Sequence, residues 1–218
     1  MARLSVWHAF IHPITGFFRK QRGVRLLNTF PEIAQMRICD LGGSQHFWQK
    51  LALPVQPDNI TIFNISLGAT EASGRSLYSS VPIIIYDGKR VPAGDKEFDL
   101  LICNSVIEHV PMEQRSSLAQ EMVRVTKRLF LQTPAWNFPI EPHFIMPFIH
   151  WLPKSAGYWM ALVSPWRLLS KPSEEDINSY FFGTNLLKEQ ELRKLFPCAE
   201  IIPERLLGLT KSYMIVIR

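Results

Sequence analysis

One short stretch constrains the fold more than any other: residues 37–45, Arg-Ile-Cys-Asp-Leu-Gly-Gly-Ser-Gln. Ile38, Cys39 and Leu41 give it the apolar character of a buried strand, and an acid, Asp40, stands just before two glycines. Glycine has no Cβ, so the backbone there can turn sharply and approach a ligand closely. A glycine turn at the carboxyl end of a parallel strand is typical of the ligand-binding edge of an open α/β sheet.

Apolar segments at regular intervals predict the rest of this sheet. The strands that they predict cover residues 36–41, 60–65, 82–86, 98–104, 129–132, 199–206 and 212–217. The helices predicted by apolar spacing and end signals cover residues 44–53, 112–126 and 184–196. Strands that alternate with helices predict an α/β fold with a doubly wound, mostly parallel sheet. The turn near Gly208 is too short for a parallel crossover, so the last strand is expected to be antiparallel.

The composition fits a single domain over residues 1–218, with 47% hydrophobic residues. Three cysteines form no disulfide framework, which favours a reducing, cytoplasmic setting. The net charge of +5 is concentrated in a basic, helical N-terminal segment, residues 1–35. This segment either presents a solvated helix face or meets an anionic surface. His8, His12 and Pro13 interrupt its apolar run, so neither a signal peptide nor a membrane-spanning helix is expected.

Two motifs resemble those of a known enzyme family. Asp40 precedes the glycines and a complete G-x-G-x-x-G is absent, which argues against a dinucleotide site. Residues 98–110, Phe-Asp-Leu-Leu-Ile-Cys-Asn-Ser-Val-Ile-Glu-His-Val, resemble the fourth motif of the methyltransferase type 11 group. Over residues 30–135 and 184–218 the chain is similar to class I S-adenosylmethionine-dependent methyltransferases. The resemblance implies a Rossmann-like, seven-stranded methyltransferase fold and S-adenosylmethionine as the cofactor.

The resemblance also implies which residues hold the cofactor. Asp40 would orient its amino acid portion, with the backbone of Gly42 and Gly43 in close approach. Asn64 stands where the family usually places a carboxylate for the ribose hydroxyls, and its amide either bonds those hydroxyls or caps the strand. The remaining predicted contacts are Asp87 and Gly88 at the adenine, which are also a common turn pair, and Asn104 and Ser105 near the methyl group.

Four polar residues are candidates for catalysis on the acceptor side. Glu108 and His109 follow the fourth strand, while Glu141 and His143 are two residues apart and would point the same way in an extended segment. An imidazole titrates near neutral pH and can take a proton from a substrate hydroxyl. Alternatively, these residues tie loops together by hydrogen bonds, and methyl transfer depends on alignment alone. No metal site is predicted, because Glu141 and His143 lack a third ligand at recognisable spacing.

A proline-rich, aromatic insert over residues 136–180 follows the fifth strand, where methyltransferases often build a substrate lid. It holds four of the six tryptophans. The run Thr-Pro-x-x-x-Phe-Pro-Ile-Glu-Pro-His-Phe resembles a bacterial subgroup associated with cell-surface glycans and lipid-linked sugars. Its aromatic residues, edged by Lys154, Arg167 and Lys171, suit a membrane interface or a helical lid packed onto the sheet.

These observations predict a methyltransferase that acts on a hydroxyl, or an amine, of a small-molecule, glycan or lipid-linked acceptor. It would work in the cytoplasm, with peripheral contact at the inner face of the membrane. A nucleic-acid acceptor is not expected, because the basic charge is modest and localised. Two other classes stay open. One is a degenerate methyltransferase fold that binds without catalysis, which Asn64 favours; the other is a nicotinamide-dependent enzyme, which Asp40 and the missing third glycine oppose.

Overall fold

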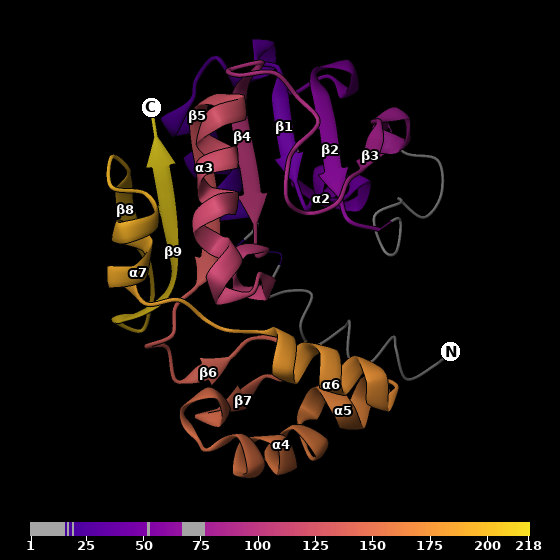
Figure 1. The fold of residues 1–218 in the computed structure, drawn as a ribbon, viewed down its shortest axis with the longest axis vertical. Helices are drawn as coiled ribbons and strands as arrows, with labels where there is room; N and C mark the ends of the chain where they lie inside the picture. Colours follow the sequence, from indigo (N-terminus) through magenta and orange to yellow (C-terminus); the bar gives the residue numbers. More distant parts are fainter. Residues whose placement is uncertain (1–15, 17, 19, 52, 67–76) are drawn as a thin grey trace.

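A seven-stranded sheet forms the larger body of the structure, a computed structural model that describes residues 16, 18, 20–51, 53–66 and 77–218 (Figure 1). In spatial order its strands are β3 (Ile83–Ile85), β2 (Ile60–Asn64), β1 (Ile38–Leu41), β4 (Phe98–Asn104), β5 (Thr126–Pro134), β9 (Leu209–Ile217) and β8 (Glu200–Leu206). The first five pair in parallel, and β9 runs antiparallel to both of its neighbours. The predicted sheet, with its antiparallel last strand, is confirmed.

The strand register brings the predicted cofactor residues to one edge of the sheet. Asp40 on β1 pairs with Ile62 on β2 and with Ile102 on β4. Asn64 and Asn104 each lie two residues beyond these partners, at the ends of their strands. Because residues two apart in a strand share a face, the glycine turn after β1 lies between two asparagine side chains on the same face.

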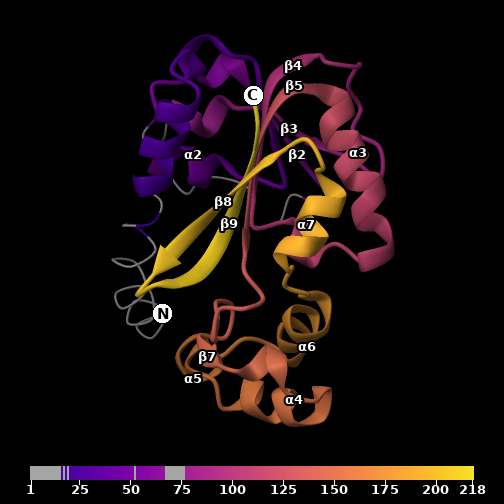
Figure 2. The same ribbon diagram turned by 90° about the vertical axis from the view of Figure 1, so that its left-hand side faces the viewer.

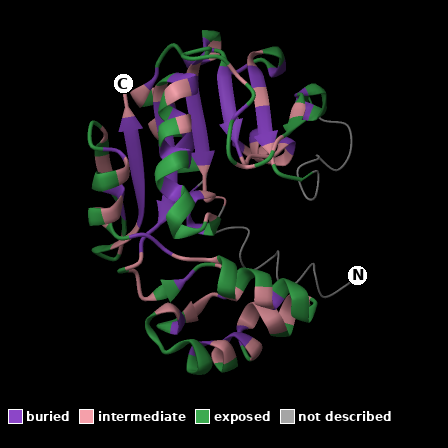
Figure 3. Cartoon of the chain, in the orientation of Figure 1, coloured by how far each residue is buried: buried purple, intermediate pink, exposed green. Residues whose placement is uncertain are grey.

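Helices cover both faces of the sheet (Figure 2). One face carries α3 (Arg115–Val125) and α7 (Glu189–Leu195), and the other carries α2 (Gln45–Leu51) and the helix over residues 20–29. The inner strands β2, β1, β4, β5 and β9 are buried along most of their length (Figure 3), whereas the edge strands β3 and β8 are largely exposed or half-buried. Two apolar clusters therefore form the core, one on each side of the sheet.

The predicted end of α3 and the predicted start of β5 are wrong, because the first residues of β5 include charged side chains. β5 begins at Thr126, three residues before its predicted start at residue 129. α3 ends at Val125, one residue before its predicted end at residue 126. Lys127 and Arg128 look like loop residues in the sequence, but each forms an ion pair at the surface, with Asp99 at 2.7 Å and Glu32 at 3.2 Å respectively. Long basic side chains can extend from a strand end into solvent, so their charge does not exclude a strand.

The last predicted helix is shorter than expected. α7 begins at Glu189, whereas the apolar spacing predicted a start at residue 184. Asn185 instead lies in an extended segment: its N–H donates to Glu108 O at 2.7 Å, and Arg115 Nη2 donates to its carbonyl oxygen at 2.6 Å. These tertiary hydrogen bonds replace the helical ones that the local sequence would favour.

Residues 136–183, called the insert below, form a smaller body beyond the carboxyl ends of the parallel strands (Figure 1). Its elements are β6 (Ile140–Glu141), β7 (Met146–Pro147), α4 (Lys154–Leu162), α5 (Pro165–Ser170) and α6 (Glu174–Gly183). The insert has an apolar core of its own, formed by Phe144, Ile149, Ala161 and Ile177. The chain leaves and re-enters the main sheet at one place, because Ala135 and Leu187 form a parallel bridge there.

The basic N-terminal segment is only partly described. Residues 20–29 form a helix, as expected for part of this segment, and residues 1–15, 17 and 19 lie outside the described residues. Within the described part of the chain, the helices are too short or too polar to cross a membrane.

Candidate active site

The turn after β1 requires both of its glycines. Gly42 has φ +73°, and a Cβ there would lie 2.5 Å from Val106 Cγ2. A Cβ on Gly43 would lie 1.7 Å from Asp40 Oδ2, far inside van der Waals contact. The glycine turn therefore folds directly over the Asp40 carboxylate. A side chain at position 43 would clash with that carboxylate, and one at position 42 would clash with Val106.

Asp40 is fully buried beneath this turn. Trp48 Nε1 donates to its Oδ2 at 2.7 Å, while Oδ1 has no hydrogen-bond partner among the described residues. Burial raises the pKa of Asp40 to about 7, although the Trp48 hydrogen bond acts in the opposite direction. An unpaired buried carboxylate oxygen costs free energy, so a donor or cation arriving from a ligand would be stabilised there.

All eight predicted cofactor residues line one or both of two neighbouring cavities. The first, about 230 Å³, is lined by Asp40, Gly42, Gly43 and Asn104, together with Ser44, His46 and Phe47. The second, about 540 Å³, is lined by Gly42, Asn64, Asp87, Gly88 and Ser105, with Phe63, Tyr86 and Val106 among its apolar walls. Gly42 lines both, so the two cavities border the same glycine turn.

Two of these residues also stabilise local backbone. Asn64 Nδ2 donates to Gly43 O at 3.1 Å, and its Oδ1 accepts from Ile65 N at 2.8 Å, so the side chain links the end of β2 to the glycine turn. Asp87 Oδ1 accepts from the N–H groups of Lys89 and Arg90, which lowers the pKa of its exposed carboxyl group. The capping and turn interactions weighed for Asn64 and Asp87 are therefore present in the protein.

Asn104 and Ser105 are held by long-range contacts. Arg22 Nη1, from the helix over residues 20–29, donates to Asn104 Oδ1. Ser105 has φ +55°, a strained conformation for a residue with a Cβ, and its N–H donates to Gln132 O at 2.9 Å. Its hydroxyl also donates to Gln132 Oε1 at 3.1 Å. β5 therefore fixes the turn at the end of β4.

Glu108 lies in a single 3₁₀ turn, Ile107–His109, and is fully buried. Thr133 Oγ1 donates to its Oε2 at 2.9 Å, and its Oε1 has no partner among the described residues. Burial raises the pKa of this carboxyl group, although Thr133 and His143 act in the opposite direction.

Glu141 and His143 do contact each other, but across a turn rather than along an extended strand. Glu141 ends β6, and its Oε1 accepts from His143 Nδ1 at 2.5 Å. Its Oε2 accepts from Phe144 N at 2.8 Å, which fixes the carboxylate. Burial alone would lower the pKa of His143, but the hydrogen bond and charge of Glu141 outweigh burial and raise it.

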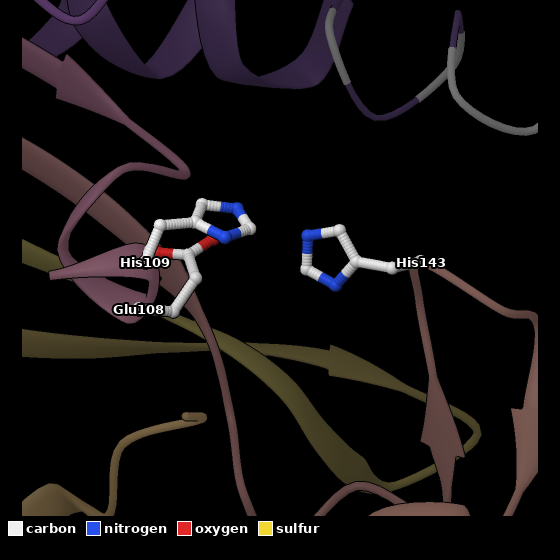
Figure 4. Close-up of side chains that lie close together, drawn as sticks. All are labelled: Glu108, His109 and His143. Carbon is white, nitrogen blue, oxygen red and sulfur yellow. The ribbon is translucent and has the colours of Figure 1, made fainter. Parts of the chain in front are cut away.

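The structure joins the two pairs of acceptor-side residues into one cluster (Figure 4). The rings of His109 and His143 lie 4.9 Å apart, centroid to centroid, and cross at 78°. One potential ligand atom from each of Glu108, His109 and His143 lies within 4.8 Å of the other two. Desolvation and then repulsion from His143 lower the pKa of His109 to about 4, although part of this residue remains exposed.

Comparison with known proteins agrees with this geometry. Residues 40–129 match a family model described as a methyltransferase domain. This part of the chain is therefore similar to a methyltransferase domain. The match covers the glycine turn, both asparagine-ended strands and the Glu108–His109 turn, and it supports S-adenosylmethionine as the predicted cofactor. No curated protein matches the sequence significantly.

Solved structures share the fold of this chain. Magnesium protoporphyrin IX methyltransferase from Synechocystis PCC 6803, with bound SAH, is 14% identical and has a TM-score of 0.52, covering 93% of this chain and 82% of that one. The methyltransferase domain of bacterial CtHen1-CN is 12% identical with a TM-score of 0.54, covering 90% and 97%. The PH0226 protein from Pyrococcus horikoshii OT3 is 14% identical with a TM-score of 0.51, covering 90% and 89%. At these identities the likeness concerns the fold.

Residues of the insert line two further cavities of the protein. One, about 410 Å³, is walled by residues of the insert and of the extended segment after it, including Trp136, Glu141, Tyr180 and Lys188. The other, about 430 Å³, has mostly apolar walls such as Phe138 and Ile140, and it reaches Asn104, Ser105, Arg22 and Lys211. The second has the apolar walls and few polar groups that suit a small organic ligand, whereas the first also carries charged residues such as Arg115 and Glu191.

Sequence reasoning missed two charged residues of this site. Arg22 reaches Asn104 and lies 4.0 Å from the buried acid Glu204, which also pairs with Lys211 at 2.7 Å. Arg22 belongs to the basic N-terminal segment, and Glu204 to the edge strand β8. Their spacing in the sequence carries no motif, because only the tertiary fold brings them together.

Proposed function

We propose that the protein binds S-adenosylmethionine in the two cavities that Gly42 lines. One observation carries the proposal: all eight residues predicted from the family resemblance line two cavities that share Gly42, and Asp40, whose buried Oδ1 has no partner among the described residues, lines the first of them. A positively charged amino group of the cofactor would pair with that oxygen. Asn64, Asp87 and Gly88 would surround its nucleoside portion, and Asn104 and Ser105 would lie near its reactive end.

We propose that the acceptor is a small molecule, glycan or lipid-linked compound, methylated on an oxygen or, alternatively, a nitrogen. When bound, the cofactor supplies an electrophilic methyl group. The protein's contribution is to align the acceptor with it and to handle the acceptor proton. Glu141 lines one of the insert cavities and bonds His143, which lies beside Glu108 and His109. Aromatic walls of the same cavity, such as Trp136 and Tyr180, support an amphipathic acceptor.

We propose that the insert is the substrate lid and that its outer surface contacts the cytoplasmic face of a membrane. Trp159 is 71% exposed and Leu168 is 62% exposed, and Lys154, Arg167 and Lys171 edge the same helices. Exposed aromatic and aliphatic residues edged by cations suit an anionic lipid interface. A lipid-linked acceptor would then reach the insert cavities from the membrane.

A second candidate function, cofactor-free binding on a methyltransferase fold, is favoured by Asn64. Both functional atoms of this amide already bond the backbone, at Gly43 O and Ile65 N. A carboxylate here would accept the ribose hydroxyls more strongly. Weak or absent cofactor binding would be the signature of this alternative.

Calorimetry distinguishes the two. Titration of the full chain with S-adenosylmethionine and S-adenosylhomocysteine should give saturable binding, with no binding of NAD. Asp40→Asn should weaken binding of both ligands, whereas Asp58→Asn, an exposed position in the 3₁₀ turn before β2, should not. Absence of binding to the unaltered protein would remove the proposed function and favour the second candidate.

A further inference from the structure

We propose that Glu108, His109 and His143 bind a divalent transition-metal ion, for which Zn²⁺ is the best match. The donor set is one carboxylate and two imidazoles, whose ligand atoms lie within 4.8 Å of one another. Two histidines and one glutamate are a donor set that binds Zn²⁺ with one coordination position left open. A small inward movement of the three side chains would bring all three donors to one ion.

The hydrogen-bonding capacity of this cluster is not fully used within the described residues. Glu108 is fully buried, yet its Oε1 finds no partner among the described residues, although two imidazoles stand beside it. A buried carboxylate oxygen without a donor is unfavourable unless something compensates it. A bound cation would supply that compensation, since both imidazoles can offer a lone pair to the same ion.

The surrounding residues already orient the donors. Glu141 Oε1 bonds His143 Nδ1 at 2.5 Å, so the other ring nitrogen of His143 is turned toward His109 (Figure 4). Thr133 fixes one oxygen of Glu108 at 2.9 Å and leaves the other oxygen to the cluster. Thr184 Oγ1 lies 3.2 Å from His109 Nδ1. Carboxylates and hydroxyls that orient metal-binding imidazoles in this way are the usual outer shell of a metal site.

The ion would also explain why the insert contributes to the site. His143 lies in the insert and Glu108–His109 lies at the end of β4, so one ion would tie the insert to the sheet edge. In its open position the ion would bind the acceptor oxygen and favour loss of its proton to water. That oxygen would then bond the methyl carbon as the carbon–sulfur bond breaks and sulfur keeps the electron pair. This catalytic role rests on the proposed function, whereas metal binding itself does not.

The test measures metal binding without cofactor. The tag-free full chain is stripped with a chelator and titrated with Zn²⁺ by calorimetry, and with Co²⁺ by its visible absorption. One equivalent per chain is expected. His109→Ala and His143→Ala should each weaken Zn²⁺ binding at least ~100-fold, and Glu141→Gln, which alters only the outer shell, about 10–100-fold. The control Asp58→Asn, at an exposed carboxylate outside the cluster and outside the cofactor cavities, should bind Zn²⁺ normally.

Folding is checked by thermal unfolding, and His143→Gln replaces any alanine variant that does not fold. Absence of stoichiometric metal binding, or full binding by both histidine variants, would overturn the inference. The same preparations are titrated with S-adenosylmethionine. Normal cofactor binding beside failed metal binding would reject the metal site alone, and the converse result would reject the cofactor site alone.

Discussion

Gly43 lies over Asp40 so closely that a Cβ at position 43 would stand 1.7 Å from Asp40 Oδ2. The carboxylate cannot retreat, because it is fully buried and held by Trp48 Nε1 at 2.7 Å. Position 43 must therefore be glycine because of the neighbouring Asp40 carboxylate, whether or not a ligand approaches the turn.

Gly43→Ala is expected to lower the free energy of unfolding by about 1–3 kcal/mol, the usual cost of overpacking, and to weaken cofactor binding. Urea denaturation measures the first effect and calorimetry the second. Gly183→Ala is the matched control, since a Cβ there meets nothing within 4 Å. It should leave both quantities nearly unchanged. Equal behaviour of the two variants would show that the turn and the acid are not packed as described.

Asp40 should make stability depend on pH. Its pKa rises from 3.8 to about 7 on folding, so between these values the native state holds the proton more tightly than the unfolded state. This stabilisation is complete below the unfolded pKa and is lost as pH rises through the folded pKa, by on the order of 1 kcal/mol per pH unit. Urea midpoints from pH 4.5 to 8 should therefore fall more steeply for the unaltered protein than for Asp40→Asn. Parallel slopes would contradict the raised pKa.

Arg115 should be important for stability because it ties three segments together. It is 1% exposed, and it bonds Val110 O at 3.0 Å, Asn185 O at 2.6 Å and Glu191 Oε1 at 2.6 Å. Arg115→Met leaves these acceptors unpaired and should cost about 3–5 kcal/mol.

Arg193→Met is the control for Arg115→Met, because Arg193 forms an exposed pair with Glu189 at 2.6 Å. Removing that pair should cost about 1 kcal/mol or less. Denaturation curves compare the two variants, and a similar loss of stability in both would refute the special role of Arg115.

The insert surface should govern membrane association. Trp159→Glu places a charge among the exposed apolar residues of α4 and should reduce co-sedimentation with anionic liposomes several-fold. Leu207→Glu, at a residue that is 95% exposed in the β8–β9 turn, is the control and should sediment like the unaltered protein. If the unaltered protein stays in the supernatant, the proposed membrane contact is wrong.

Local sequence patterns predicted the elements in which one physical signal dominates. The bounds of β4 are as predicted, because its apolar run over residues 100–103 ends at a polar residue, Asn104. Leu118, Met122 and Val125 are buried on α3 as their spacing requires. The early start of β5 was missed because basic side chains at its end project into solvent.

The acceptor-side cluster shows what spacing cannot reveal. His143 lies 34 residues after His109, in a separate body with its own core, so no local pattern links them. The residues of each pair were recognised from chemistry, but their meeting depends on how the insert returns to the sheet. Arg22 was missed for the same reason.

Ala135 and Leu187 pair as neighbours, and Trp136 N donates to Leu187 O at 3.0 Å. The two connections between the sheet and the insert thus lie side by side. The segment between them can be exchanged without rearranging the sheet; under the proposed function, such an exchange would change the acceptor and keep the cofactor site. A chimaera that grafts another insert onto residues 135 and 187 would be the corresponding laboratory construction.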